Sequence, residues 1–200
     1  MSKVKICGLS RAEDITIVNR VLPDFIGFVF APSRRRVCAA AAAALKASLN
    51  PRIKAVGVFV NDDIGIIADM HRNNIIDLAQ LHGDEDDAYI ANLKERCCCP
   101  IIKAVGVGSR LPTMPDGADY LLFDALSEQR GGAGKTFDWN LLADYAGPPF
   151  FLSGGLDVHN VSEAIKTLSP YCVDVSSGVE SGGFKNKKMI ADFVRIARTL

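Results

Sequence analysis

The chain lacks an excess of charge of either sign. Its 200 residues include 23 Lys plus Arg and 23 Asp plus Glu, so its formal net charge is zero. Proteins that bind nucleic acids or anionic membranes usually carry a basic excess, so neither kind of partner is expected. The chain also lacks an apolar run as long as a membrane span, and charged residues interrupt any signal-peptide core near the N-terminus. These absences predict a cytoplasmic protein.

The six cysteines lack the spacing of either a disulfide framework or a zinc site. Three of the six cysteines are consecutive, at Cys97–Cys99, whereas disulfide frameworks and zinc sites need spaced thiols. We therefore expect no metal site, and we expect these three residues to be reduced thiols that pack at the end of a helix.

Apolar, β-branched runs are abundant in the remaining sequence. Hydrophobic residues make up 48% of the chain, which suits one compact domain over residues 1–200. Eight runs have the length and composition of buried strands. They are Val4–Cys7, Phe25–Phe30, Ile53–Val60, Ile76–Leu81, Ile101–Val105, Tyr120–Phe123, Phe150–Leu152 and Cys172–Val175.

Most of the segments between these runs have helical character. Ser10 and Glu13 have the spacing of a capping box, and the apolar positions that follow them share one helical face. The segment 106–118, GVGSRLPTMPDGA, holds two prolines and three glycines, which predicts only a short or broken helix. Further helices are expected at Ala39–Ala44 with Leu45, Ile64–Met70, Glu85–Cys97, Val161–Leu168 and Lys188–Ala197.

Eight strands that alternate with helices predict parallel βαβ units. An open, doubly wound sheet usually has fewer strands in a chain of this length. A closed (β/α)8 TIM barrel needs eight strands, and 200 residues is the lower limit of its size. We therefore expect an α/β protein with a minimal (β/α)8 barrel, whose chemistry lies at the carboxyl ends of the strands.

Polar residues and glycines follow nearly every predicted strand, so one rim of the barrel is expected to be polar. In chain order these rim residues are Cys7, Arg34–Arg36, Asn61, His82, Asp124, Ser153–Gly155 and Ser176–Gly178.

Cys7 at the end of the first strand has two interpretations. A lone cysteine is most often a packed hydrophobe. Strand alternation, however, puts Lys5 and Cys7 on one face and Val4 and Ile6 on the other. If the apolar face meets the helices, the Cys7 thiol points into the mouth of the barrel.

Other rim residues also have a structural and a functional interpretation. Asp124 either caps a loop or acts as a general acid or base. The arginine triplet is either a solvated loop or a carboxylate clamp. His82 is a weaker candidate for substrate binding. Asp174 has the parity to point inward, as a substrate-binding residue or as a buried ion pair with Lys5.

Two glycine-bearing segments, SGGLDVHNV and SSGVESGG, follow the seventh and eighth strands. In TIM barrels these loops commonly bind phosphate, because glycine lets backbone N–H groups approach an anion. The candidate phosphate ligands are Gly154, Gly155, Ser177 and Gly178, with tight turns as the structural alternative. GGAGKTFDW at 131–139 lacks the spacing of a nucleotide-binding P-loop.

These segments together resemble the phosphoribosylanthranilate isomerase family of tryptophan biosynthesis. The matching stretches are KICG, GFVF with SRRRV behind it, VGVFVN, QLHGDE, FDA, GGAGKTFDW, LSGGL and VDVSSGVES, which occur in family order from Lys5 to Ser181.

The resemblance implies a (β/α)8 barrel without cofactor or metal. It implies an aldose–ketose isomerase that performs an Amadori rearrangement on a small phosphosugar, N-(5-phosphoribosyl)anthranilate. The family's catalytic cysteine falls on Cys7 and its catalytic aspartate on Asp124. The carboxylate-binding arginine falls on Arg35, between Arg34 and Arg36. A thiol that acts as a base would benefit from a lowered pKa.

Two rival functions and two oligomeric states stay open at this point. Another phosphosugar isomerase barrel with paired aspartates would have a carboxylate where this chain has Cys7. A non-catalytic phosphate-binding barrel would bind phosphosugars without turnover. The chain is expected to be a monomer or a homodimer.

Overall fold

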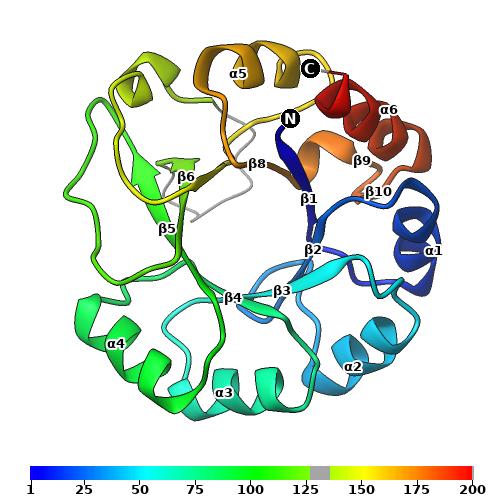
Figure 1. Ribbon diagram of the computed structural model, residues 1–200. Coiled ribbons are helices and arrows are strands. Elements are labelled where there is room, and N and C mark those ends of the chain that lie inside the picture. The colour runs from blue at the N-terminus through cyan, green and yellow to red at the C-terminus, as the bar shows by residue number, and fades with distance from the viewer. Residues whose placement is uncertain (127–135, 200) are drawn as a thin grey trace.

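The computed structural model describes residues 1–126 and 136–199. Its centre is a closed barrel of eight parallel strands, hydrogen-bonded in the order β1 to β8 and back to β1. Helices surround the barrel on the outside (Figure 1). The predicted (β/α)8 architecture is therefore confirmed, and the open doubly wound sheet is excluded.

All eight predicted strands are present, with small changes in their bounds. They are β1 (Lys3–Cys7), β2 (Phe25–Val29), β3 (Lys54–Phe59), β4 (Leu78–Leu81), β5 (Ile101–Val107), β6 (Tyr120–Ala125), β7 (Phe150–Leu152) and β8 (Cys172–Val175). After β8 come a 3-10 turn, η2 (Ser177–Val179), and a small hairpin of β9 (Glu180–Ser181) and β10 (Phe184–Lys185).

The expected helices also form. They are α1 (Ala12–Val21), α2 (Ala39–Ala47), α3 (Ile64–Arg72), α4 (Asp87–Arg96), α5 (Val161–Leu168) and α6 (Lys187–Arg198). Cys97 follows α4 directly, and all six cysteines are free thiols. Of the P-loop-like segment, 131–135 lies outside the described residues, and a short 3-10 helix, η1 (Trp139–Leu142), begins at its last residue.

The predicted start of the first helix was wrong by one residue. Asp14, not Glu13, caps α1: its Oδ2 accepts the backbone N–H groups of Ser10 and Arg11, each at 3.0 Å. Asp14 is 1% exposed, whereas Glu13 points to solvent and pairs with Arg11. The helix begins at Ala12, so Asp14 rather than Glu13 comes within reach of the free N–H groups that precede the first turn.

The short helix expected between β5 and β6 does not form. Residues 108–119, all of which are described, are irregular. Pro112 and Pro115 each lack a backbone N–H, and Gly117 has a φ of +79°, so no run of helical hydrogen bonds can start here.

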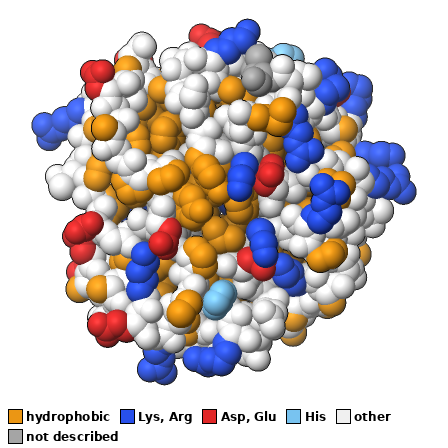
Figure 2. Space-filling model, in the orientation of Figure 1, with side chains coloured by type: hydrophobic (Ala, Val, Ile, Leu, Met, Phe, Trp, Pro, Cys, Tyr) orange, Lys and Arg blue, Asp and Glu red, His pale blue; other side chains and the backbone are white. Residues whose placement is uncertain are grey.

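The strands alternate as predicted between the barrel interior and the helix layer. Val4 and Ile6 are buried in the core shared with the helices, while Lys5 points inward and bonds to Asp174 on the neighbouring β8 and to Gln80 on β4. A second apolar cluster fills the interior below the polar residues; its members are Phe25, Val56, Leu78, Ile102, Leu122, Phe151 and Cys172. Apolar side chains also gather over the centre of the face shown in Figure 2.

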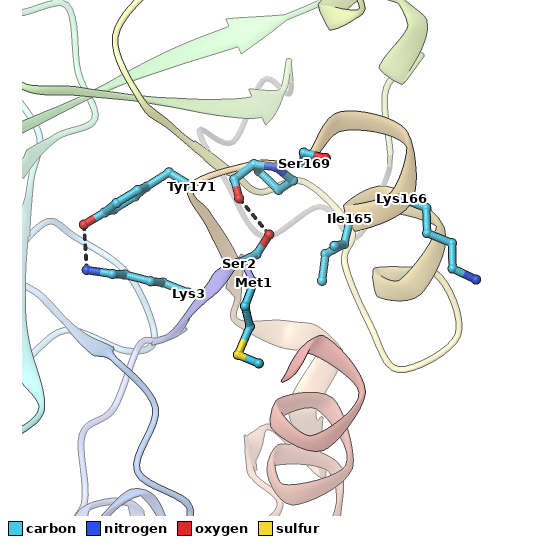
Figure 3. Close-up of a pocket in the computed structure, with 8 residues that line it drawn as sticks. Met1, Ser2, Lys3, Ile165, Lys166, Ser169 and Tyr171 are labelled. Carbon is cyan, nitrogen blue, oxygen red and sulfur yellow. Dashed lines mark hydrogen bonds between the residues drawn. The ribbon is translucent and has the colours of Figure 1, made fainter. Parts of the chain in front are cut away.

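A pocket of about 450 Å³ lies at the end where the strands begin, away from the predicted rim. Residues just before or at the start of β1 and β8 line it, and Figure 3 shows Lys3 bonded to Tyr171 there. None of the predicted site residues lines this pocket. Within the described residues, no helix is long and apolar enough to cross a membrane.

Candidate active site

Cys7 is the last residue of β1, at the mouth of the barrel, and glycines lie beside it in the chain and on the neighbouring strand. Gly8 follows with a φ of +82°. This conformation, which glycine adopts readily, turns the backbone away from the barrel directly after Cys7. The Cys7 carbonyl accepts a hydrogen bond from the Ser176 hydroxyl at 3.1 Å. The residue opposite Cys7 on β2 is Gly27, whose lack of a side chain leaves room for the sulfur.

Two buried lysines flank the Cys7 thiol. Burial raises the pKa of Cys7 above its usual value, while the positive charges of Lys5 and Lys185 act in the opposite direction. The thiol therefore does not have the lowered pKa from which a base would benefit, because removal from water outweighs the two cations. The same cations would balance the charge of a thiolate once it forms.

Lys5 is completely buried and occupies the interior one layer below Cys7. Its ammonium donates to Asp174 Oδ2 at 2.7 Å and to Gln80 Oε1 at 2.9 Å. Although burial lowers the pKa of Lys5, the nearby acidic groups, Asp174 foremost, together outweigh this effect and raise that pKa. The structure thus contains the predicted buried ion pair. Asp174 Oδ1 is buried and has no hydrogen-bond partner among the described residues, so this carboxylate retains an unused acceptor.

Asp124 lies near the end of β6, separated from β1 by β7 and β8. His82 follows β4, and its Nε2 is 3.5 Å from Asp124 Oδ2; both side chains are 15% exposed. Gly154 is close to the other carboxylate oxygen: a Cβ at this glycine would be 3.1 Å from Asp124 Oδ1. The barrel therefore brings His82, Asp124 and the loop after β7 together.

The three arginines after β2 have different surroundings. Arg35 is 16% exposed and forms a bidentate pair with Glu180, with Nε–Oε1 at 2.8 Å and Nη2–Oε2 at 3.0 Å. Its Cδ lies beside Gly8, so it faces the mouth near Cys7. Arg34 also pairs with Glu180 but is 55% exposed, and Arg36 is exposed. This placement favours Arg35 over its neighbours as a ligand for a substrate carboxylate.

Glu180 and Lys185, from the β9–β10 hairpin, were not predicted as site residues. Lys185 Nζ donates to Glu180 Oε1 at 2.7 Å and to the Ser176 carbonyl at 2.9 Å. Although burial raises the pKa of Glu180, bonds from Arg35 and Lys185 dominate and lower it to about 2. Glu180 therefore remains a carboxylate that orients Arg35 at neutral pH.

The loops after β7 and β8 meet, as expected for a phosphate site. Gly154 and Gly155 have φ values of +84° and +65°. Gly178 packs so tightly against this loop that a Cβ there would be 2.0 Å from the Leu156 carbonyl oxygen. Within the described chain, the N–H groups of Gly154, Gly155, Ser177 and Gly178 make no hydrogen bond to a protein oxygen. They are available to an anion.

The predicted site residues thus lie at one end of the barrel, and Gln80, Glu180 and Lys185 join them. Gln80 has the same strand parity as His82, which was the signal that could have identified it. Glu180 and Lys185 follow β8 within the glycine-rich segment, but nothing in the local pattern indicates their partners. In residues 1–126 and 136–199 no group of three or more His, Cys, Asp or Glu side chains is placed to hold a metal ion.

Comparisons with known proteins agree with one another. Residues 4–196 match the family model described as N-(5'-phosphoribosyl)anthranilate isomerase. A protein of that name from Endomicrobium trichonymphae is 48% identical, with 100% of both chains covered. The crystal structure of phosphoribosyl anthranilate isomerase from Thermotoga maritima is 36% identical, covers 100% of both chains and has a TM-score of 0.87.

Two further solved structures bear on ligands and assembly. One is a phosphoribosyl anthranilate isomerase in complex with reduced 1-(o-carboxyphenylamino)-1-deoxyribulose 5-phosphate, with 33% identity, a TM-score of 0.84 and 100% of both chains covered. The other contains monomers generated from the dimeric Thermotoga maritima enzyme, with 33% identity, a TM-score of 0.83 and the same coverage.

Proposed function

Because this chain belongs to the N-(5'-phosphoribosyl)anthranilate isomerase family, we propose that Cys7 and Asp124 carry the proton transfers of that family's reaction. The chain is an isomerase of tryptophan biosynthesis. It converts N-(5'-phosphoribosyl)anthranilate to 1-(2-carboxyphenylamino)-1-deoxyribulose 5-phosphate by an Amadori rearrangement.

In the proposed mechanism, Asp124 is the general acid and Cys7 the general base. Asp124 protonates the furanose ring oxygen, the C1–O bond breaks, and the nitrogen lone pair forms a C1=N Schiff base. The Cys7 thiolate then removes the proton from C2. The C2–H electrons form a C1=C2 bond, and those of C1=N return to nitrogen. The resulting enol takes a proton at C1 and loses the proton of its C2 hydroxyl, which gives the ketone.

The main support for this assignment is that a thiol and a carboxyl group lie at the same mouth of the barrel. A half-buried thiol with nearby lysines ends β1, and a carboxyl 3.5 Å from an imidazole lies near the end of β6. Ring opening and C2 deprotonation need one acid and one base on the same sugar. Burial that raises the pKa of Cys7 also makes its thiolate a stronger base.

We further propose that opposite ends of the substrate bind to opposite groups on the rim. Arg35 uses Nε and one Nη2 hydrogen to hold Glu180. Its two Nη1 hydrogens and second Nη2 hydrogen can then take the anthranilate carboxylate. The N–H groups of Gly154, Gly155, Ser177 and Gly178 would bind the phosphate. His82 and Asp174 are placed to contact the sugar between these ends.

The relatives also support coarser proposals about partners and location. A phosphosugar-like product analogue occupies one solved relative, and another relative is dimeric. We infer a small-molecule substrate, a monomer or homodimer, and a cytoplasmic enzyme without nucleic-acid or membrane partner.

The decisive experiment follows the loss of anthranilate-type fluorescence from freshly made N-(5'-phosphoribosyl)anthranilate. Cys7→Ala and Asp124→Asn should each lower kcat by at least about 10²-fold, the lower limit for a lost general acid or base. Circular dichroism should show an intact fold. In the wild type, the pH dependence of kcat/KM should be bell-shaped, because the reaction needs one group as an acid and the other as a base. Near-normal turnover by either folded variant would refute its assigned role.

A further inference from the structure

A chain of polar groups crosses the barrel from Lys5 to Asp124; Lys5 and Gln80 are buried, and His82 and Asp124 are half-buried. Lys5 Nζ is 2.9 Å from Gln80 Oε1, and Gln80 Nε2 is 2.8 Å from His82 Nδ1. His82 Nε2 is 3.5 Å from Asp124 Oδ2. Lys5 and Gln80 are 0% and 2% exposed, so water does not compete for the contact between them.

The chemistry of each group decides which atoms donate. An ammonium can only donate, so Lys5 must face the amide oxygen of Gln80. The amide nitrogen therefore faces His82, and it too can only donate. His82 Nδ1 must then be the acceptor and carry no proton. In the neutral imidazole the proton is consequently on Nε2, the nitrogen that faces Asp124.

We propose that Gln80 is a positioning residue that holds His82 in the Nε2–H tautomer, aimed at the carboxyl group of Asp124. The Lys5 ammonium, which can only donate, fixes the orientation of the Gln80 amide and so the tautomer of His82. In the other tautomer, Nδ1–H would face the amide N–H of Gln80 at 2.8 Å. Two donors would then point at each other, which is unfavourable.

The benefit to Asp124 rests on its proposed role as the general acid. When Asp124 has given its proton to the ring oxygen, a carboxylate is left beside the His82 Nε2–H. The donor is already in place, so the new charge is stabilised without rearrangement. The 3.5 Å separation is at the long limit of a hydrogen bond, and such contacts often tighten when substrate binds.

Nitrogen NMR of the full-length protein tests the tautomer directly. Protonated and unprotonated ring nitrogens have well separated ¹⁵N shifts, and a His82→Gln variant assigns the signals. His71 and His159, whose rings bond to no described residue, provide internal references. In the wild type, His82 Nδ1 should lie closer to the unprotonated limit than in either reference. A proton on Nδ1 of wild-type His82 would overturn the proposal.

Two Gln80 variants separate tautomer control from general structure. In Gln80→Glu the introduced carboxylate accepts from both Lys5 and His82, so Nδ1 should gain a proton; an unchanged spectrum would overturn the proposal. In Gln80→Met, which has similar volume but no amide, His82 should match the tautomer mixture of the references, and kcat should fall by at least about tenfold with little change in KM. A kcat equal to wild type would overturn the benefit to Asp124.

These readouts distinguish failure of this proposal from failure of the proposed mechanism. The NMR spectrum reports the His82 tautomer whether or not Asp124 is the acid. If an Asp124→Asn variant were active, the proposed mechanism would be refuted, but the His82 tautomer seen in the wild-type spectrum would still stand.

Discussion

Gly27 and Cys7 face each other across the β1–β2 pair so closely that a Cβ on Gly27 would lie 2.7 Å from the Cys7 sulfur. No real side chain tolerates such a contact. The absence of a side chain at residue 27 therefore sets the position of the thiol, since the strand register itself is fixed by backbone bonds.

Gly27→Ala should displace the Cys7 sulfur and lower kcat by up to about 10²-fold, the cost of a displacement of about 1 Å in a reacting group. KM should change little, because the proposed carboxylate and phosphate contacts lie elsewhere. Gly108→Ala is the matched control, since its Cβ would meet only Leu126 at an ordinary 3.4 Å. Steady-state kinetics check both. Equal kcat in the two variants would show that the tight Gly27–Cys7 contact is unimportant.

Arg35→Ala should raise KM roughly ten- to hundredfold, the effect of losing a charged hydrogen bond. The reduction in kcat should be smaller, because the substrate carboxylate is remote from the reacting carbons. Arg36→Ala is the control, because Arg36 is exposed and lies in the same loop. If Arg36→Ala or Arg34→Ala gives the large increase in KM and Arg35→Ala does not, the assignment within the triplet is wrong.

Gly155→Val should weaken competitive inhibition by inorganic phosphate by roughly tenfold or more, because it blocks backbone donors that would each contribute a charged hydrogen bond. The control is Gly182→Val. Gly182 has a similar φ of +59° and open space around it, so the backbone strain is matched without any effect on the proposed phosphate site. Inhibition constants measured for both variants test this. Similar values would place the phosphate elsewhere on the rim.

Glu180 should make stability depend on acid pH. Its pKa is about 2 in the folded protein against an ordinary 4.5, so its contribution is present above about pH 4.5 and is lost as the pH falls towards 2. The full contribution is of the order of 3 kcal/mol. The difference in unfolding free energy between wild type and Glu180→Gln should therefore shrink across this range.

Denaturant titrations at several pH values measure this difference. Asp192→Asn is the control, because Asp192 also pairs with cations but is on the exposed face of α6; it should give a small difference that salt removes. A difference for Glu180→Gln that stays constant from pH 5 to about 2 would contradict the lowered pKa.

The eight strands and the polar rim at their carboxyl ends could be predicted from the sequence. Apolar β-branched runs separated by helical segments are local signals, and alternation along β1 places Lys5 and Cys7 inside from residue types alone. The order of polar residues after the strands predicted Cys7, His82 and Asp124 at one mouth, because parallel strands all end on the same side.

Which of these groups meet could not be predicted from local patterns, because the contacts join residues far apart in the chain. Lys5 and Gln80 are 75 residues apart, and Arg35 and Glu180 are 145 apart, so closure of the barrel and the register between strands bring each pair together. The raised pKa of Cys7 has the same origin, because burial of the thiol depends on the packing around it rather than on its neighbours in the chain. The local sequence pattern predicts where a strand ends, whereas the closure of the sheet determines which side chains that end contacts.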